Sequence, residues 1–323
     1  MSSYRFTISL IIGAIAVLSS GCSTPIHSGS VAYDRVQPAA VEILVNGRMA
    51  GSGSIVDKNG TVLIAAHMLP KGASKLEAHA RTLGRYPVRL VALDQAHDLA
   101  LLQLPVRDEP WPHLAVAQQT PQAGERVFVF GAPVFRHEVM LAGTVARARP
   151  TFEFYNGAFR EILHITAISP IGTSGGPWVN ARAEIFGVQS AAMTIKGGHQ
   201  GVAYAAPLSA IRELINRREN IQAPTLQAGF EELWSQQPSF LNKLPKDFRG
   251  VVVRQLNGNG TAAKAGLKEW DIVVSVNGKT YERTEKLLRF IRSKKPGDTL
   301  QLKATDREGK NLRELSVKLV PIS

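Results

Sequence analysis

The sequence predicts a mainly β protein with two groups of short strands followed by a third β-rich region. Three observations favour this fold class: many short runs rich in valine and isoleucine, turn dipeptides between those runs, and 28 glycines with 18 prolines in 323 residues. A chain of this length that is 44% hydrophobic can bury more than one core, so two or three domains are expected.

The first strand group precedes residue 105, where short apolar runs alternate with turn signals. Asn46-Gly47 and Asn59-Gly60 are dipeptides typical of tight hairpin turns. The expected strands are residues 41–45, 51–56, 61–65, 89–94 and 99–104. The proline-rich residues 105–121 are expected to cross over to the second group.

The second strand group is expected at residues 126–130, 138–146, 159–168, 184–190 and 201–206. Two such groups predict two small antiparallel barrels, which place functional residues on loops at their junction. A helix is expected over residues 209–220, because Ile211, Leu214 and Ile215 share one face. Pro224 marks the domain boundary, and a β sandwich with helices, one of them at residues 283–293, is expected beyond it.

The most informative motif is the glycine-rich segment GTSGGP at residues 172–177, which contains Ser174. A serine hydroxyl is a weak nucleophile that needs a base, and the base needs a carboxylate to orient it. His67 follows a strand that ends in small residues, and Asp98 precedes an apolar strand. We therefore expect Ser174 to be the nucleophile, His67 the base and Asp98 the orienting acid of a hydrolase.

Each partner of Ser174 has a local competitor. His97 is adjacent to Asp98 in the sequence and is expected to point to the opposite face of an extended segment. Asp94 ends an apolar run and is followed by Gln95, which is typical of a solvated turn. Neither is therefore expected in the catalytic set.

From about Val36 to Ala206 the chain resembles the trypsin-like serine proteases and, within them, the HtrA/DegP family. The resemblance rests on His67, Asp98 and the GTSGGP segment, with GSGSIV at residues 51–56 and GVAYAAP at residues 201–207. It implies a trypsin-like double β-barrel and an oxyanion hole formed by Gly172, Thr173 and Ser174. It also implies substrate-binding positions at Ile168, Gln189, Ser190 and Ala191.

Two details of this region give further expectations. Ile168 matches the base of the primary specificity pocket and carries no charge, so cleavage after small or medium aliphatic residues is expected. Thr173 stands where digestive relatives have aspartate, and a threonine cannot form an ion pair with a new N-terminus, so zymogen cleavage is not expected. The resemblance instead implies that residues 167–173 switch between ordered and disordered states.

From Leu226 to Val320 the chain resembles a PDZ domain, on the segments AAKAGL at residues 262–267, DIVVSVNG at residues 271–278 and KPGD at residues 295–298. The resemblance implies a site for a peptide C-terminus at Ala228, Gly229, Phe230, Leu287, Leu288 and Ile291. Glu269-Trp270 departs from the Pro-Gly usual in one family turn. Basic residues recur every third position at Arg283, Lys286, Arg289 and Arg292, which usually indicates a solvated helix face.

The N-terminus predicts export. Arg5 precedes an apolar stretch from Phe6 to Leu18 that is too short to span a membrane, and residues 19–21 are small. Cys22, the only cysteine, excludes an intramolecular disulfide. It is expected to be the acylated cysteine of a bacterial lipoprotein, although Leu18 lies one place earlier than a lipobox leucine; the alternative is an unpaired thiol. The following Ser23 implies the outer membrane.

These observations predict four segments: a signal peptide at residues 1–21, a tether at 22–36, a trypsin-like domain at 37–222 and a PDZ-like domain at 223–323. The formal net charge is +12, which in a cytoplasmic protein would suggest nucleic acid. Export argues against that partner. Anionic lipid, lipopolysaccharide or acidic polypeptide are the alternatives, besides plain solubility.

The expected function is a lipid-anchored serine endopeptidase of the bacterial envelope that faces the periplasm. It would cleave unfolded or damaged polypeptides, sense or recruit peptide C-termini, and need no cofactor and no metal. Alternatives are a noncatalytic peptide-binding chaperone or sensor on a protease fold, and an esterase using the same acyl chemistry. The short loop at residues 46–48 disfavours a large cage, while a homotrimer is compatible with the resemblance.

Overall fold

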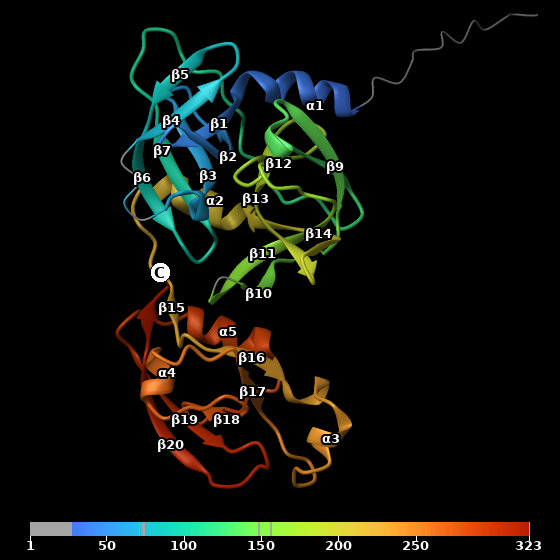
Figure 1. Cartoon of the computed structure of the whole chain (residues 1–323), viewed down its shortest axis with the longest axis vertical. Coiled ribbons are helices and arrows are strands. Elements are labelled where there is room, and N and C mark those ends of the chain that lie inside the picture. The colour runs from blue at the N-terminus through green and yellow to red at the C-terminus, as the bar shows by residue number, and fades with distance from the viewer. Residues whose placement is uncertain (1–27, 71, 73–74, 148, 156, 323) are drawn as a thin grey trace, which may run out of the picture.

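The computed structural model describes residues 28–70, 72, 75–147, 149–155 and 157–322, in two β-rich bodies side by side with a third below them (Figure 1). The expected signal peptide and Cys22 lie outside the described residues. Within the described part, no helix combines the length and apolar character needed to cross a membrane.

The described chain begins with helix α1 (Ser28–Val36), where the sequence had suggested an irregular tether. Ala32 and Val36 are fully buried and share a core cluster with Phe128 and Phe130, because residues four apart lie on one helix face. The ring of Tyr33 packs on Phe130 at a centroid distance of 5.4 Å. This part of the tether expectation is wrong, since α1 belongs to the globular domain.

The first body is a seven-stranded antiparallel sheet in the order β5-β4-β1-β2-β3-β7-β6. The hairpin of β1 and β2 turns at Asn46 and Gly47, whose φ angles of 50° and 80° are left-handed as the dipeptide predicted. The half-polar strands β4 and β5 were not expected. The strands are β1 (Ala40–Val45), β2 (Arg48–Ile55), β3 (Thr61–Ala65), β4 (Leu76–Ala80), β5 (Gly84–Pro87), β6 (Arg89–Asp94) and β7 (Leu99–Gln103).

The second body is a seven-stranded sheet in the order β10-β11-β14-β13-β12-β8-β9, and a further pairing of β9 with β11 closes it. Strands β10 and β12 were not expected; β12 is short and begins with proline. The strands are β8 (Arg126–Gly131), β9 (Val139–Val145), β10 (Thr151–Tyr155), β11 (Ala158–Thr166), β12 (Pro177–Val179), β13 (Ile185–Ile195) and β14 (Gly198–Pro207).

Helix α2 (Leu208–Arg217) joins the two sheets. Its buried residues Ala210, Ile211 and Leu214 lie in the same core cluster as Leu99 of β7 and Val188 of β13. The junction between the bodies is therefore a packed core. Three 3₁₀ turns complete this part: η1 (Gln37–Ala39), η2 (Ala66–Met68) and η3 (Pro133–Phe135).

The third body is a five-stranded antiparallel sheet in the order β16-β17-β18-β19-β20, with a separate β15–β21 pair. In the turn where Glu269-Trp270 replaces the usual Pro-Gly, Trp270 takes a φ of 71°. The guanidinium of Arg254 lies over the Trp270 ring at 3.7 Å from its centre. The elements are β15 (Pro224–Thr225), β16 (Gly229–Glu232), η4 (Leu233–Ser235), α3 (Pro238–Leu241), β17 (Val251–Arg254), α4 (Thr261–Lys264), β18 (Ile272–Val276), α5 (Thr284–Arg292), β19 (Thr299–Thr305), β20 (Arg313–Lys318) and β21 (Val320–Pro321).

The β10–β11 hairpin of the second body reaches the third body next to α5 (Figure 1). Phe152 of β10 lies in the same core cluster as Phe230 and Leu288, and Phe159 of β11 packs against that cluster. The two domains therefore share an apolar contact made by this hairpin.

Candidate active site

His67 and Asp98 meet at the end of the first sheet. His67 lies in η2 directly after β3, and Asp98 precedes β7, which pairs with β3. The two atoms His67 Nδ1 and Asp98 Oδ2 are 2.7 Å apart, and the amide of His67 donates to Asp98 Oδ1 at 2.8 Å. The imidazole is thus oriented by a two-point contact with the carboxylate, as the sequence led us to expect.

Asp98 is almost completely buried and takes a left-handed φ of 57°, which is uncommon for a residue other than glycine. Burial alone would raise the pKa of its carboxyl group, but the hydrogen bonds from His67 and Ser190 outweigh burial and hold the pKa below its usual value. The group is therefore an ionised carboxylate that can stabilise a cationic imidazole.

The turn that carries Ser174 packs against β2 and against β3, the strand that leads to His67. The amide of Ser52 in β2 donates to the carbonyl of Ser174 at 2.8 Å. Gly175 has a φ of 80°, and a Cβ atom there would lie 2.1 Å from the carbonyl oxygen of Ser52 and 3.1 Å from the amide nitrogen of Ala65. Only glycine allows this approach. The glycine brings the serine turn onto the strand that leads to His67.

Two backbone amides of the serine turn, those of Gly172 and Ser174, have no hydrogen-bond acceptor among the described residues. Gly172 has a φ of 98°, and a Cβ atom there would lie 2.3 Å from the carbonyl oxygen of Ala132. Both amides are therefore available to a developing negative charge.

Thr173 does not supply a third free donor as expected. Its amide donates to the carbonyl of Pro170 at 3.1 Å, and its hydroxyl donates to the same carbonyl at 2.7 Å. The residue closes the turn before Ser174. The amide of Val134 in η3 donates to the carbonyl of Ile171 at 2.7 Å and supports the same loop from outside.

The four expected substrate-binding residues have different surroundings. Ile168 is 65% exposed and Ala191 is partly exposed, so both can meet a substrate. The side chain of Gln189 is buried and accepts a hydrogen bond from the indole of Trp178 at 2.8 Å. The hydroxyl of Ser190 donates to Asp98 Oδ2. The side chains of Gln189 and Ser190 are therefore committed to internal hydrogen bonds, and the expected pairing of residues 189–191 with an extended substrate concerns their backbone.

Two residues that sequence reasoning did not single out connect the loop before Ser174 to β14. His199 Nε2 lies 3.3 Å from the hydroxyl of Ser169, and its Nδ1 accepts from the amide of Gly201 at 2.9 Å. Gln189 also donates to the hydroxyl of Ser169 at 3.1 Å. No local pattern distinguishes Ser169 or His199, because the contacts arise between segments thirty residues apart.

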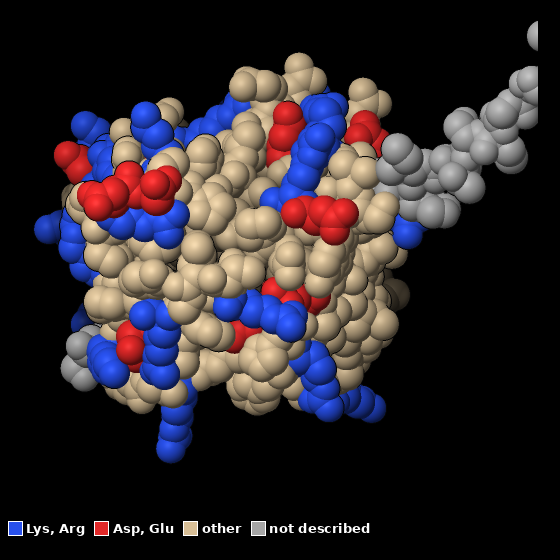
Figure 2. Space-filling model, turned by 90° about the horizontal axis from the view of Figure 1, so that it is seen from above, with Lys and Arg blue, Asp and Glu red and all other residues tan. Residues whose placement is uncertain are grey.

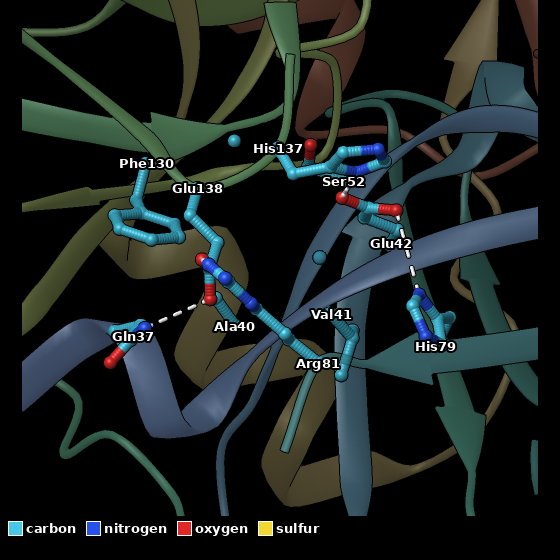
Figure 3. A pocket seen from close by; sticks show the side chains of 12 residues that line it. Gln37, Ala40, Val41, Glu42, Ser52, His79, Arg81, Phe130, His137 and Glu138 are labelled. Atoms are coloured by element: carbon cyan, nitrogen blue, oxygen red, sulfur yellow. Dashed lines mark hydrogen bonds and ion pairs between the residues drawn. The ribbon is translucent and has the colours of Figure 1, made fainter. Parts of the chain in front are cut away.

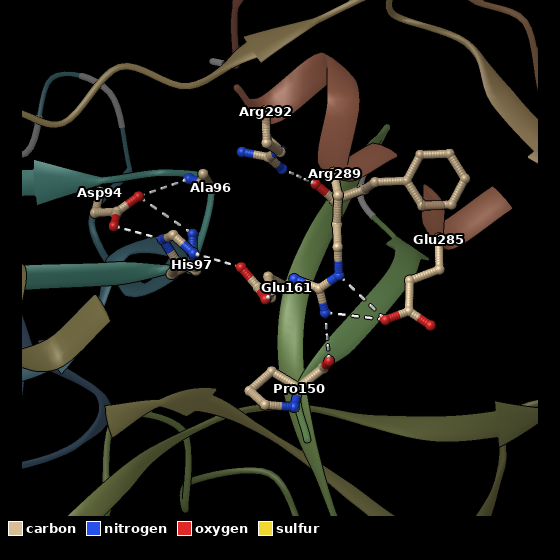
Figure 4. Close-up of polar contacts among 9 residues, drawn as sticks. Asp94, Ala96, His97, Pro150, Glu161, Glu285, Arg289 and Arg292 are labelled. Carbon is tan, nitrogen blue, oxygen red and sulfur yellow. Dashed lines mark hydrogen bonds and ion pairs between the residues drawn. The ribbon is translucent and has the colours of Figure 1, made fainter. Parts of the chain in front are cut away.

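The local competitors form a separate pair. His97 Nδ1 lies 2.6 Å from Asp94 Oδ2, and His97 Nε2 lies 3.5 Å from Glu161 (Figure 4). Burial alone would lower the pKa of His97, but its bonds to Asp94 and Glu161 raise that pKa to about 9. Asp94 is fully buried, so the expectation of a solvated turn is wrong: its carboxylate accepts from the amides of Ala96 and His97.

Comparison with known proteins agrees with both parts of the fold. Residues 51–188 match the family model of a trypsin-like peptidase domain, and residues 224–319 match that of a PDZ domain. The chain therefore combines a trypsin-like peptidase domain with a PDZ domain that follows it.

Among its relatives are two proteins described as probable periplasmic serine endoprotease DegP-like. That of Hahella chejuensis is 29% identical over 266 residues, which are 80% of this chain and 54% of the relative. That of Chlamydia trachomatis is 27% identical over 279 residues, covering 84% of this chain and 54% of the relative. The chain thus spans about half the length of these curated relatives.

Solved structures share the fold at low sequence identity. An HtrA-type protease AlgW with decapeptide has a TM-score of 0.64 and 17% identity, over 90% of this chain and 98% of that one. A serine endoprotease from Yersinia pestis has a TM-score of 0.61 and 19% identity, over 91% of this chain and 98% of that one.

The expected peptide groove of the PDZ domain is closed by the peptidase domain of the same chain. Ala228, Phe230, Leu288 and Ile291 line a cavity of only about 10 Å³, together with residues 224–226, Arg292 and, from the peptidase domain, Phe159 of β11. The ring of Phe159 lies parallel to that of Phe230 at a centroid distance of 6.5 Å.

Two of the expected groove residues have other surroundings. Leu287 is fully buried in the core of the PDZ domain and does not line this cavity. Gly229 pairs with Arg254 of β17, and a Cβ atom on it would lie 2.5 Å from the Arg254 carbonyl oxygen. Leu287 and Gly229 therefore support the groove from behind.

Two of the regularly spaced basic residues on α5, Arg289 and Arg292, bond the peptidase domain. Arg292 donates to the carbonyl of Phe159 at 2.5 Å, and burial lowers the pKa of Arg292 to about 10, which leaves it cationic. Arg289 bonds Glu161 at 3.3 Å and the carbonyl of Pro150 at 3.1 Å (Figure 4). The expectation of a solvated face is wrong for Arg292; Arg289 is exposed as expected, although it also bonds the peptidase domain.

A second cavity of about 320 Å³ lies between β1, β4 and β8 (Figure 3). His137 and His79 both face the carboxylate of Glu42, while Arg81 and Gln37 face Glu138. Ser52 is shared with the active site, since its hydroxyl donates to the carbonyl of Gly172 at 2.8 Å. Among the described residues, no three His, Cys, Asp or Glu side chains are arranged to hold a metal ion.

Proposed function

We propose that this chain is a serine endopeptidase that cleaves polypeptides through an acyl-enzyme. The observation that carries the proposal is the His67–Asp98 pair beside a turn in which the amides of Gly172 and Ser174 are free. His67 takes the proton of the Ser174 hydroxyl during attack on the scissile carbonyl, and Asp98 stabilises the resulting imidazolium. The two amides stabilise the oxyanion. The proton then passes to the leaving amine, and water releases the acyl product.

Active-site labelling tests this proposal. A fluorophosphonate probe is expected to modify the wild-type chain at Ser174 and to leave the Ser174→Ala variant unmodified. Ser209→Ala, at an exposed position of α2, is the matched control and should label like the wild type. A wild-type chain that stays unlabelled, with and without C-terminal peptides, would contradict the proposal and favour a noncatalytic peptide-binding chaperone.

We infer that the primary specificity pocket accepts small or medium aliphatic side chains, because Ile168 brings no charge to its base. A substrate paired as an added strand along residues 189–191 would have to be extended, which selects unfolded or damaged chains over folded ones. Profiling with a peptide library measures the preference. A strong preference for arginine or lysine would contradict the assignment of Ile168.

The PDZ-like domain is proposed to recruit or sense peptide C-termini, with the carboxylate bound by backbone amides near Ala228 and Gly229. Because Phe159 occupies the groove, a peptide has to displace this ring, which separates the two domains at their shared contact. We further infer that residues 167–173 switch between ordered and disordered states when this happens. An activity that stays constant with every peptide ligand would contradict this coupling.

The names of the relatives support a place in the bacterial envelope, facing the periplasm. Attachment is proposed to be through an acylated Cys22, in the outer membrane, with a homotrimer as the candidate assembly. On the face seen from above, basic and acidic side chains are interspersed (Figure 2), so this face is not a purely basic surface for membrane attachment. Loss of radiolabelled palmitate in Cys22→Ala is the expected result.

A further inference from the structure

Tyr155, at the tip of the β10–β11 hairpin, reaches the buried acid of the triad through one intermediate residue. Its hydroxyl lies 2.9 Å from the hydroxyl of Ser190, and Ser190 donates to Asp98 Oδ2. Asp98 in turn faces Nδ1 of His67 at 2.7 Å. A line of hydrogen bonds thus joins the hairpin to the catalytic base.

The direction of these hydrogen bonds follows from the proton count. A serine hydroxyl has one proton, and an ionised carboxylate can only accept. Since Ser190 gives its proton to Asp98, the bond between the two hydroxyls is donated by Tyr155. Burial, and then the negative charge of Asp98, raise the pKa of the Tyr155 phenol, so this donor keeps its proton at all physiological pH values.

Arg160 holds this tyrosine and the catalytic turn together. It is 5% exposed, which is rare for an arginine, and its guanidinium lies 4.8 Å from the centre of the Tyr155 ring. Its Nη1 donates to the carbonyl of Tyr155 at 2.5 Å, and its Nε donates to the carbonyl of Gln95 at 3.2 Å. Gln95 lies in the turn between β6 and β7 that also contains Asp98.

We propose that Tyr155 is a positioning residue for catalysis, acting on Asp98 through Ser190, with Arg160 fixing the tyrosine to the turn of the catalytic acid. The inference rests on the proposed peptidase function and assigns a role within it. Each donor polarises the next, so removal of the Tyr155 hydroxyl weakens the bond from Ser190 and loosens the carboxylate that orients His67. The substrate contacts are not changed.

The β10–β11 hairpin, which carries Tyr155, also contacts the PDZ domain. Phe152 and Phe159, on the same two strands as Tyr155 and Arg160, are packed against the PDZ core, and Arg292 bonds the carbonyl of Phe159. Glu161, next to Arg160, bonds both His97 of the catalytic turn and Arg289 of α5. The position of the PDZ domain is thereby linked to the acid of the triad by residues of one hairpin.

The test is Tyr155→Phe in the full chain, assayed with a peptide substrate. We expect kcat to fall about tenfold while KM stays within about twofold, the pattern of an interaction that matters in the transition state. Tyr204→Phe is the matched control: Tyr204 is a buried neighbour whose ring centre lies 6.1 Å from that of Tyr155, but it bonds neither Ser190 nor Asp98. Its kcat should remain within about twofold of the wild type.

A double-mutant cycle separates positioning from general loss of structure. If Tyr155 acts through Ser190, Tyr155→Phe should change kcat by less than about twofold in a Ser190→Ala background. Additive effects, or equal effects of Tyr155→Phe and Tyr204→Phe, would overturn the proposal. Wild-type labelling by fluorophosphonate reports the peptidase function separately, so a labelled wild type with an unimpaired Tyr155→Phe overturns only the positioning role.

A second variant covers the case in which Tyr155→Phe does not fold. Arg160→Lys keeps the positive charge but cannot reach the carbonyls of both Tyr155 and Gln95, because an ammonium lacks the guanidinium fork. We expect a fall in kcat of about threefold or more with an unchanged KM. An unchanged kcat in a folded Arg160→Lys chain would contradict the role given to the arginine and its tyrosine.

Discussion

Asp98 shows how single residues set the chemistry of this site. A carboxylate that is 1% exposed keeps its charge only when hydrogen bonds replace the water it has lost. His67 contributes its amide and its ring, and Ser190 contributes its hydroxyl. The left-handed backbone of Asp98 is tolerated because these contacts determine its position, together with the hydrogen bond that the amide of Ala66 donates to the Asp98 carbonyl.

Gly175 gives a test of the close packing around Ser174. In Gly175→Ala the new methyl would lie 2.1 Å from the Ser52 carbonyl oxygen, so the serine turn has to move away from β2. We expect the rate of fluorophosphonate labelling to fall by at least about 100-fold, because a displacement of about 1 Å costs this much in an oriented site. The rate is measured from the extent of labelling in samples quenched at successive times.

Gly47→Ala is the control for backbone strain alone. Gly47 has the same φ of 80° as Gly175, but a Cβ atom there meets nothing within 4 Å. Both variants should lose about 1–3 kcal/mol of stability from the strained backbone, while only Gly175→Ala should lose labelling. Similar labelling rates in the two variants would contradict the packing argument.

Among the elements, the turn between β6 and β7 has the densest set of charges. His97 faces Asp94 in its own turn, Glu161 on β11 and, at longer range, Arg292 on α5, while Arg289 bonds Glu161 (Figure 4). The two carboxylates keep His97 protonated at neutral pH. Asp98 lies in this turn, and the turn is held by Glu161 of β11, which also bonds Arg289 of α5.

The charge of His97 makes the stability of this element depend on pH. Its pKa is raised from 6.5 to about 9, so the stabilisation is complete below pH 6.5 and disappears as the pH rises through 9. We expect the wild type to be more stable than His97→Gln by about 2–3 kcal/mol at pH 6, with the difference shrinking toward pH 10. Urea unfolding at several pH values measures it, and a difference independent of pH would show that His97 is neutral.

For the molecule as a whole, the arrangement of the two domains decides what the PDZ-like groove can bind. Phe159 closes the groove, and the arginines Arg289 and Arg292 bond the peptidase domain beside it. A peptide therefore competes with an internal ring, and its affinity is reduced by the fraction of molecules in which the groove is closed.

Phe159→Ala is expected to open this groove. Removal of the ring should tighten the binding of a C-terminal peptide by about tenfold, since burial of a phenylalanine contributes about 1.5–3 kcal/mol to the closed form. Fluorescence anisotropy with a labelled peptide measures the affinity, and the same peptide with an amidated C-terminus controls for the carboxylate.

A second control keeps this experiment specific. Phe135→Ala removes an exposed aromatic ring of the peptidase domain that does not line the groove, and it should leave peptide affinity unchanged. Equal affinities of the wild type and Phe159→Ala would mean that the ring does not compete with the peptide.

The contact of His67 with Asp98 and the glycine turn around Ser174 could be predicted from the sequence because each depends on residue types that few other structures require. Asn46-Gly47 predicted its hairpin because the dipeptide tolerates a left-handed backbone. Strands β10 and β12 escaped prediction, since one is half polar and the other begins with proline, and pairing with neighbours decides both.

Contacts across long sequence separations had no local signal. Ser190 is 92 residues from Asp98 and was expected to be a substrate-binding position. Phe159 and Arg292, which are 133 residues apart, close the groove that the sequence predicted to bind a peptide C-terminus. Local backbone preference and hydrophobic pattern are properties of neighbouring residues, so they can be predicted from the sequence. Which buried groups satisfy one another depends on how sheets and domains pack, and that is settled when the chain folds.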